Sequence, residues 1–365
     1  MRHIRNDGAE NQLIPARGYW RDWSRHLSGV ALLAVWVGIA ALFVIFAWNE
    51  SLLDPVLDWI GILATRWHLA IPDYVEVFVV RHAPRLLVLV ISLVPVLLFE
   101  TWVVGYQNSS MGRLFSGRSV SATYDLAIFA LVLCGLWTFL SVVLGFGMSW
   151  LLEQMNHSMP TDRSIHDLKI RTGSFWGDLS LYFVALTFFD YWTHRLFHMK
   201  PLWYLHRMHH SATEMTVLTL WRGHPAAPVV ESVLRTWPLA LFDMSAACTA
   251  LIAYFVVSYE YLIHSNLPWT WGWFGRWVLI PPAGHRIHHS SDPAHVSVNL
   301  GIVVLWDRLF GTWRGSGIGT ESIGVVGVPY NSGRYLEEAW RDLLVFLRAL
   351  LKMGTRARGV TIARP

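Results

Sequence analysis

Two long apolar runs without a charged residue constrain the fold of this chain more than any other feature. One extends from Leu27 to Trp48, 22 residues, and the other from Leu126 to Leu152, 27 residues. About 20 apolar residues in a helix cross the hydrocarbon of a bilayer, which is about 30 Å thick. Only 15% of the residues are charged, against roughly a quarter in soluble domains. We therefore predict that both runs are transmembrane helices.

Several shorter apolar segments are weaker candidates for membrane crossings. Charged residues interrupt or shorten them, which a bilayer tolerates where the polar groups face protein or a wet cavity. The sequence therefore predicts an all-α, polytopic membrane protein with four to six transmembrane helices. The weaker segments are residues 86–99, 179–189, 226–242 and 244–263.

Basic residues predict the orientation of the chain in the membrane. Arg17, Arg21 and Arg25 precede the first apolar run, and the positive-inside rule then places the N-terminus in the cytosol. The formal net charge of +4 suits anionic lipid head groups. No basic stripe of the kind that binds nucleic acid is present, so we expect no nucleic-acid partner.

The chain divides into four predicted parts. Residues 1–26 form a polar, basic N-terminal segment, residues 27–175 contain transmembrane helices and loops, and residues 176–315 form a catalytic domain with histidine motifs. Residues 316–365 contain an amphipathic helix, Tyr335–Lys352, and a basic tail. The apolar residues of that helix recur at helical spacing, so the helix is expected to lie on the membrane surface or to pack on the catalytic domain.

Ten of the 17 histidines fall into five groups in the catalytic domain. In the first group the spacing of four residues places both imidazoles on one face of a helix. The second and fifth groups repeat the pattern His-Arg-x-His-His. The groups are His194 with His198, His206 with His209 and His210, His224 alone, His264 alone, and His285 with His288 and His289.

This clustering predicts a site for two transition metals. One metal cannot use eight or more imidazoles, whereas two metals can. Imidazole suits iron, zinc, copper and nickel, and the scarcity of carboxylates around the motifs excludes magnesium and calcium. His224 and His264 are single, and a lone histidine is more often a hydrogen-bonded core residue than a ligand. Cys134 and Cys248 are the only cysteines, so a cysteine metal site is excluded.

The order and spacing of the motifs in residues 180–315 resemble the fatty acid hydroxylase and sterol desaturase superfamily of membrane di-iron enzymes. The likeness is greatest to its bacterial sterol-desaturase-like branch. The motifs are Tyr191-Trp-x-His194-Arg-x-x-His198, Trp203-x-x-His206-Arg-x-His209-His210-Ser211, Arg222-Gly-His224-Pro225, His264-Ser-Asn266, His285-Arg-Ile-His288-His289-Ser290, Asn299-Leu-Gly301 and Trp306-Asp307-Arg-Leu-Phe310-Gly311-Thr312.

The resemblance implies a fold, a cofactor and an activity. It implies membrane helices capped by a cytosolic helical domain, in the inner (cytoplasmic) membrane of a bacterium, with two iron ions as cofactor. With O2, such a centre hydroxylates or desaturates a C–H bond of a membrane lipid; which lipid, and which of the two reactions, stay open. The implied iron ligands are His194, His198, His206, His209, His210, His285, His288 and His289, with His224 and His264 completing the set.

Acidic residues near the motifs are candidates for a supporting role. Ligating imidazoles usually donate their second N–H to a carboxylate or a carbonyl, and Asp190, Asp292 and Asp307 are the candidates here. The family often has a glutamate two residues after the proline of the His-Pro motif. Ala227 occupies that position in this chain, and the nearest acid is Glu231.

Electrons for such a reaction must come from outside the chain. No dinucleotide fingerprint, cysteine cluster or fused haem domain is present in the sequence, so we expect a separate NAD(P)H-dependent donor, such as a ferredoxin, a cytochrome or a reductase. Two other classes stay open: a metal transporter, since intramembrane histidines can mark an ion path, and a zinc hydrolase with three protein ligands. The sequence does not indicate an oligomeric state.

Overall fold

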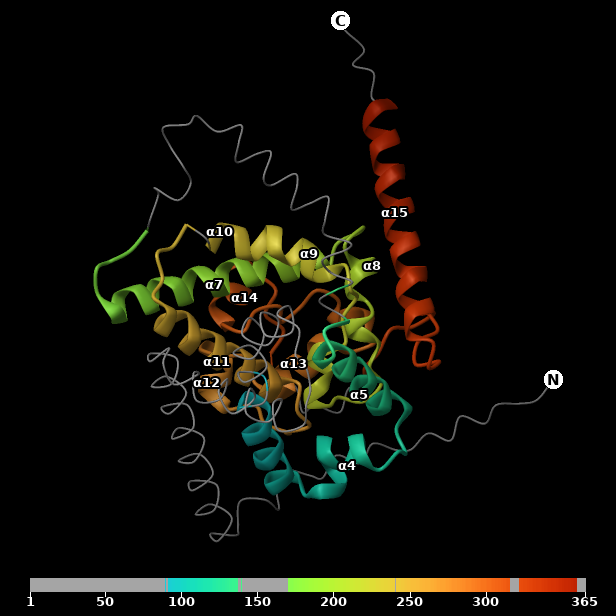
Figure 1. Cartoon of the computed structure of the whole chain (residues 1–365), viewed down its shortest axis with the longest axis horizontal. Coiled ribbons are helices and arrows are strands. Elements are labelled where there is room, and N and C mark those ends of the chain that lie inside the picture. The colour runs from blue at the N-terminus through green and yellow to red at the C-terminus, as the bar shows by residue number, and fades with distance from the viewer. Residues whose placement is uncertain are drawn as a thin grey trace, which may run out of the picture.

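Helices make up the ordered architecture of the chain in the computed structural model, which describes residues 89, 91–136, 139, 170–239, 241–315 and 322–359. In that part of the chain the only strand-like pairings are three isolated bridges, such as the antiparallel one between Leu279 and Val303. The prediction of an all-α fold is therefore confirmed for these residues (Figure 1).

The helices vary widely in length. Besides residues 91–104, the α-helices are α4 (Ser110–Phe115), α5 (Val120–Leu133), α7 (Phe175–Phe197), α8 (Trp203–His206), α9 (Ala227–Glu231), α10 (Trp237–Leu239), α11 (Ala246–Ile263), α12 (Gly272–Trp277), α13 (Pro282–His288), α14 (Val304–Leu309) and α15 (Tyr335–Gly359). Short 3₁₀ turns are Tyr106–Asn108, His209–Ser211, Val217–Trp221 and Pro293–His295, and a π-helical turn is Ser232–Thr236.

Two long helices, α7 and α11, form the scaffold of the histidine-rich region. The Ser174 hydroxyl caps α7 by accepting the Gly177 N–H at 3.1 Å, and Ser245 caps α11 in the same way through Cys248 at 3.2 Å. Such caps satisfy N–H groups that the first turn leaves free. The two helices pack against each other. Both end in a histidine, since His198 and His264 are their C-terminal caps.

A compact apolar cluster holds α13 beside α11. Tyr259 and Ile263 of α11 pack on Ile280, Ile302 and Val304, all at most 5% exposed. The helix α13 begins at Pro282, a position where proline costs no hydrogen bond and presets the backbone. The cluster therefore fixes the start of the helix that carries the last histidine motif.

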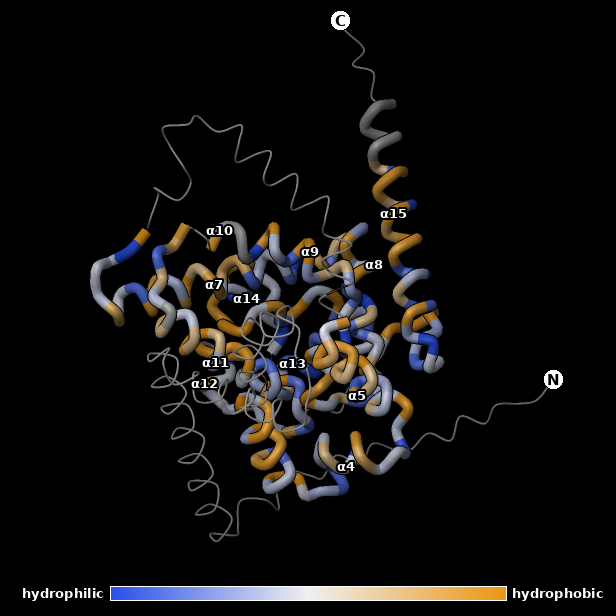
Figure 2. The backbone as a smooth tube through the Cα atoms, in the orientation of Figure 1, coloured by the Kyte–Doolittle hydropathy of each residue, from blue (hydrophilic) through white to orange (hydrophobic). Residues whose placement is uncertain are grey.

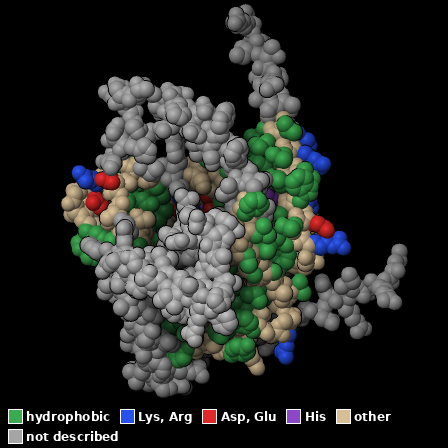
Figure 3. All heavy atoms as spheres, in the orientation of Figure 1, with side chains coloured by type: hydrophobic (Ala, Val, Ile, Leu, Met, Phe, Trp, Pro, Cys, Tyr) green, Lys and Arg blue, Asp and Glu red, His purple; other side chains and the backbone are tan. Residues whose placement is uncertain are grey.

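The amphipathic C-terminal helix α15 packs on α8 with two of its acidic residues buried. Glu338 and Asp342 are 4% and 0% exposed, whereas Leu336 and Trp340 are 58% and 60% exposed. Apolar and polar positions alternate along the helix (Figure 2), and a stripe of hydrophobic side chains runs along its outer surface (Figure 3). The catalytic domain therefore contacts a mixed face of α15, where Leu343 and Phe346 pack on its core beside the two buried acids. Part of the apolar surface of the helix, including Leu336 and Trp340, stays exposed within the described residues.

The predicted membrane crossings are only partly covered by the structure. The run Leu27–Trp48 lies outside the described residues, as does most of Leu126–Leu152. The described start of the second run belongs to α5, which ends at Leu133 because Gly135 adopts a φ of 73°. None of the described helices combines the length and the apolar composition that crossing a bilayer requires.

Candidate metal centre

Nine histidines converge into two groups, each of a size that one metal ion needs. Within each group the ligand nitrogens all lie within 4.8 Å of one another. The first group contains His194, His198, His206, His210 and His288, and the second contains His209, His264, His285 and His289.

Each His-Arg-x-His-His motif is divided between the two groups. The first motif gives His206 and His210, four residues apart, to the first group and His209 to the second. The other motif does the reverse, since His285 and His289 join the second group and His288 joins the first. Residues four apart lie on one face of a helix, whereas adjacent residues such as His209 and His210 point to different sides, so a single turn can serve two adjacent sites. The division therefore joins both groups into one centre.

Backbone carbonyls fix the orientation of several rings. The Nδ1–H of His194 donates to the Leu300 carbonyl at 2.7 Å, and that of His264 donates to the Glu260 carbonyl at 2.7 Å. The Nδ1–H of His288 donates to the Val298 carbonyl at 2.8 Å. Because the proton of each neutral ring is then on Nδ1, the Nε2 atom presents a lone pair. This is the arrangement that supports metal-ligating histidines.

The spacing of the Nε2 atoms matches that of nitrogens around a metal. In the first group, His206 Nε2 lies 3.1 Å from the Nε2 atoms of both His194 and His210. In the second, His285 Nε2 lies 3.0 Å from His264 Nε2 and 3.1 Å from His289 Nε2. Two nitrogens at right angles on a metal about 2.1 Å away lie about 3.0 Å apart. The residues therefore fit two transition-metal ions.

Two further ligand atoms lack any hydrogen-bond partner. The Nε2 atoms of His198 and His288 are buried and unpaired among the described residues. An unpaired buried polar atom costs free energy of about 1–3 kcal/mol, and a metal bond removes that cost. Both atoms belong to the first group, so their isolation supports a metal there independently of the distances.

Burial keeps these imidazoles neutral. It lowers the pKa of His206, His209 and His285 well below the usual value, and the neighbouring histidines lower it further. Burial also lowers the pKa of His194, although Asp190 and the bond to Leu300 oppose the effect. Since only a neutral imidazole binds a metal, the low pKa values favour metal binding.

His224 does not join either group. Its Nδ1 accepts the Ala226 N–H at 3.0 Å, so its Nε2 carries the proton and donates to the Ala339 carbonyl at 2.8 Å. Both nitrogens thus have backbone partners, and the ring connects the His-Pro turn to α15. His264, the other single histidine, lies in the second group.

Asp307 supports the centre through the backbone. The buried carboxylate accepts the N–H groups of Leu300 and Gly301 at 2.8 and 2.9 Å and the Thr312 hydroxyl at 2.6 Å. Burial raises the pKa of Asp307, and these hydrogen bonds oppose the rise. Asp307 therefore fixes the peptide whose carbonyl orients His194.

The other two candidate acids take different positions. Asp190 forms an ion pair with Arg235 at 2.7 Å and no hydrogen bond with a histidine among the described residues. Asp292 is exposed and caps the turn Pro293–His295 by accepting the Ala294 N–H at 2.8 Å. Among the three acids, only Asp307 is thus tied by hydrogen bonds to a ligand-orienting peptide.

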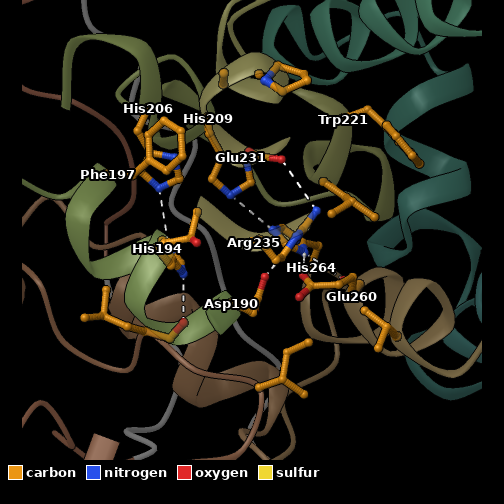
Figure 4. A pocket seen from close by; sticks show the side chains of 18 of the residues that line it. Asp190, His194, Phe197, His206, His209, Trp221, Glu231, Arg235, Glu260 and His264 are labelled. Atoms are coloured by element: carbon orange, nitrogen blue, oxygen red, sulfur yellow. Dashed lines mark hydrogen bonds and ion pairs between the residues drawn. The ribbon is translucent and has the colours of Figure 1, made fainter. Parts of the chain in front are cut away.

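A cavity of about 350 Å³ opens beside both groups. Its wall includes His194 and His206 of the first group and His209, His264 and His285 of the second. Figure 4 shows His194, His206 and His209 on one side, and Asp190, Glu231, Arg235 and Glu260 gathered on another, where His264 lies beside Glu260. The apolar part of the wall is formed by Phe197, Leu205, Leu220, Val256, Val257, Ile263 and Ile302.

Sequence patterns did not single out the backbone carbonyls or the charged wall. A carbonyl has no side-chain signal, so Leu300 and Val298 could be found only from the structure. Glu231, the acid nearest to the His-Pro motif in the sequence, lines the cavity together with Ala227. Arg235 and Glu260 lie in apolar segments, where a charged residue is costly and marks a functional site by default.

The fold and the geometry define a helical protein with two adjacent histidine groups, each of which could hold a metal ion. Residues 179–312 match the fatty acid hydroxylase family. The chain is 32% identical to alkylglycerol monooxygenase of Xenopus tropicalis over 135 residues, which are 36% of this chain and 30% of that protein. It is 31% identical to the Danio rerio enzyme of that name over 156 residues, 41% of this chain and 33% of that protein.

The enzyme of that name from Homo sapiens is 29% identical over 138 residues, 36% of this chain and 29% of that protein. The chain therefore spans about a third of the curated relatives that it matches. No solved structure shows a significant match. The part that matches the fatty acid hydroxylase family, residues 179–312, contains all nine histidines of the two groups.

Proposed function

We propose that this protein is a membrane-bound, non-haem di-iron oxygenase that hydroxylates a C–H bond of a lipid with O2 and external electrons. One observation carries the proposal: nine histidine nitrogens form two adjacent groups that share both His-Arg-x-His-His motifs. A hydrolase with a single zinc needs three protein ligands, and nine exceed that number. The match to the fatty acid hydroxylase family supports the choice of iron and of lipid.

When bound, two iron ions would supply the activation of O2 for attack on an unactivated carbon. Five nitrogens of the first group and four of the second would hold one ion each. The carbonyls of Leu300, Glu260 and Val298 fix three of the rings. The apolar part of the cavity wall offers a surface for the hydrocarbon chain of a lipid.

Hydroxylation is favoured over desaturation by the names of the relatives. Those proteins are called alkylglycerol monooxygenases, and we propose a glycerol ether lipid as the candidate substrate here. The relatives named above come from animals, and membership of the bacterial branch stays a prediction. A separate NAD(P)H-dependent electron donor is also part of the proposal.

Exposed apolar side chains support contact with a membrane. Trp273 and Trp277 of α12 are 69% and 53% exposed, and tryptophans of this kind are typical of membrane interfaces. The apolar stripe of α15, with Leu347 and Leu351 at 43% and 71%, is a second surface of the same kind. We propose that both surfaces face lipid, with the metal centre on the cytosolic side.

Metal analysis of the purified full-length protein, combined with lipid mass spectrometry, tests the proposal. We expect two irons per chain, and a gain of one oxygen in a lipid of cells that contain the gene. His288→Ala should lower the iron content and abolish the oxygen gain. His224→Ala should keep both irons, because His224 binds only backbone groups.

Three outcomes would contradict the proposal. One zinc per chain with hydrolysis of a lipid ester would indicate a hydrolase. Weakly held, exchangeable metal that moves across vesicles would indicate a transporter. Full iron content in the His288→Ala protein would show that the assignment of His288 as an iron ligand is wrong.

A further inference from the structure

One wall of the cavity is a network of charged side chains from four helical segments. Asp190 comes from α7, Glu231 from α9, Arg235 from the π-helical turn and Glu260 from α11. Arg235 joins two of the carboxylates, with 2.7 Å to Asp190 and 3.6 Å to Glu231. In Figure 4 the side chains of Asp190, Glu231 and Arg235 point toward one another, and Glu260 lies beside His264.

Two polar groups of the cavity lining, from Thr193 and Glu260, have no hydrogen-bond partner among the described residues. The Thr193 hydroxyl is buried and unpaired, and Thr193 is 4% exposed and lines the cavity. The Glu260 carboxylate has His264 Nδ1 at 3.7 Å, too far for a hydrogen bond, because that N–H is donated to the Glu260 carbonyl. A buried hydroxyl without a partner is costly, so both groups are available to a ligand.

The charges of the wall select the kind of ligand. Three carboxyl groups and one guanidinium line this wall, and the guanidinium of Arg235 is already paired with Asp190 and Glu231. A free carboxylate or a phosphate therefore finds no unpaired cation on this wall among the described residues. A hydroxyl group fits, because it donates to Glu260 and exchanges a hydrogen bond with Thr193.

We propose that this charged wall binds the uncharged, hydroxyl-bearing head group of the lipid substrate. The proposal rests on the function proposed above and assigns Glu260 and Thr193 as the groups that contact the head group. Arg235 is a positioning residue, which holds Asp190 and Glu231 in place. The hydrocarbon chain then lies along the apolar wall, which includes Leu220, Val256 and Val257.

The position of the wall also predicts which carbon reacts. The head-group subsite and both histidine groups line one cavity of about 350 Å³. A head group held at the charged wall therefore leaves only the first carbons of the chain beside the histidines. Oxidation is expected close to the head group and away from the far end of the chain.

Equilibrium binding to the wild-type holoenzyme without O2 tests the subsite. Four lipids with the same hydrocarbon chain are compared: a glycerol ether with free hydroxyls, its methyl-capped form, the fatty acid and the primary amine. The free hydroxyl form should bind roughly tenfold tighter than the capped form, since a site built for hydroxyls rejects an analogue without them, and the fatty acid should bind weakest. Equal affinities for all four lipids, or tighter binding of the fatty acid or the amine, would overturn the proposal.

The variant Glu260→Gln separates head-group binding from support of the metals. It should bring the affinities of the hydroxyl and capped forms to within about threefold of each other and raise KM more than it lowers kcat, with the iron content unchanged. Glu337→Gln is the matched control, because Glu337 is exposed on α15 and pairs only with exposed Arg334. If Glu260→Gln lost iron and kept the wild-type discrimination, the wall would serve to balance the charge of the metals, and the head-group assignment would be wrong.

Failure of this proposal can be told apart from failure of the proposed function. Oxidation of a lipid by an iron-loaded protein that does not distinguish the four head groups would reject the subsite alone. Discrimination of the head groups by a protein without iron or oxygenase activity would reject the oxygenase and leave the subsite standing. The position of the new oxygen, read from fragment masses, gives an independent result, and oxidation near the end of the chain would contradict the subsite.

Discussion

At the scale of single residues, the metal centre depends on groups that do not bind metal. Asp307 is fully buried and holds the peptide between Leu300 and Gly301. The Leu300 carbonyl in turn orients His194. The Asp307 carboxylate therefore fixes a peptide, and that peptide fixes the imidazole of His194 in the first histidine group.

Replacing Asp307 tests this chain of contacts. In Asp307→Ala the two N–H groups lose their acceptor, which should lower the free energy of unfolding by about 1–3 kcal/mol and weaken metal binding by roughly 10–100-fold. Asp307→Asn keeps one acceptor oxygen and should recover part of both losses. Iron titration and thermal unfolding of the detergent-solubilised protein measure the two effects.

Asp292 provides the matched control. It caps an exposed turn, so Asp292→Ala should cost about 1 kcal/mol and leave the metal affinity unchanged. Equal losses of metal in Asp292→Ala and Asp307→Ala would show that the connection through Leu300 has no special role.

The sequence predicted the residues of the centre better than their partners. The spacing of four residues identified pairs such as His194 with His198, which the structure places in one group. Spacing could not show that each His-Arg-x-His-His motif divides between two groups, because that depends on where the chain turns after the motif. It also could not separate His264 from His224, since both are single and only their surroundings differ. The full ligand set stays a prediction until metal is measured.

At the scale of elements, α15 is attached to the catalytic domain by buried charges. Asp342 accepts a hydrogen bond from Arg207 at 2.7 Å, and Arg207 lies inside the first His-Arg-x-His-His motif. Glu338 accepts the Tyr124 hydroxyl and the Ser332 N–H at 3.0 Å. The beginning of α15 therefore braces the segment that carries three of the histidines.

Replacing the buried Asp342 should weaken the contact between α15 and the segment that carries the first His-Arg-x-His-His motif. Asp342→Ala leaves Arg207 buried without its partner, and breaking a buried ion pair costs about 3–5 kcal/mol. We expect a lower free energy of unfolding and weaker iron binding. Denaturant unfolding and iron titration provide the measurements. Glu337→Ala on the exposed side of the same helix should stay within about 0.5 kcal/mol of the wild type, and a similar cost for both variants would contradict the brace.

Periodicity identified this helix but could not orient it. The apolar spacing predicted a helix from Tyr335 to Lys352, and the structure has one from Tyr335 to Gly359. Periodicity usually places the apolar face inward, yet here Asp342 is buried and Trp340 is exposed. The reason is the complementary charge of Arg207, which lies more than a hundred residues earlier in the chain and leaves no local signal.

At the scale of the whole molecule, one centre is assembled from four separate stretches of helix. The candidate ligands come from α7, from α8 and the turn that follows it, from the end of α11, and from α13 with its C-terminal cap. Two bound metals would cross-link these stretches, so metal binding and folding of the domain are coupled. The helical class and the motif order could be predicted from local patterns, whereas the packing that brings the stretches together depends on contacts such as those of Tyr259 with Ile280 and Ile302.

The positive-inside rule predicts an orientation of the molecule in the membrane, and single cysteines can test this prediction. Arg17, Arg21 and Arg25 predict a cytosolic N-terminus, and a soluble electron donor requires the metal centre to face the same side. Ala294 is exposed just after α13, so Ala294→Cys reports the side of the centre. Cys134 is exposed and Cys248 is buried, and the test therefore uses a Cys134→Ser background.

A membrane-impermeant maleimide should label Ala294→Cys in inside-out vesicles and not in intact cells. Glu337→Cys, on the exposed face of α15, should give the same result because α15 packs on the domain that carries the centre. The Cys134→Ser protein without an added cysteine shows the background from Cys248. Labelling of both positions from outside intact cells would place the centre on the opposite face, and electrons would then have to come from a donor outside the cytosol.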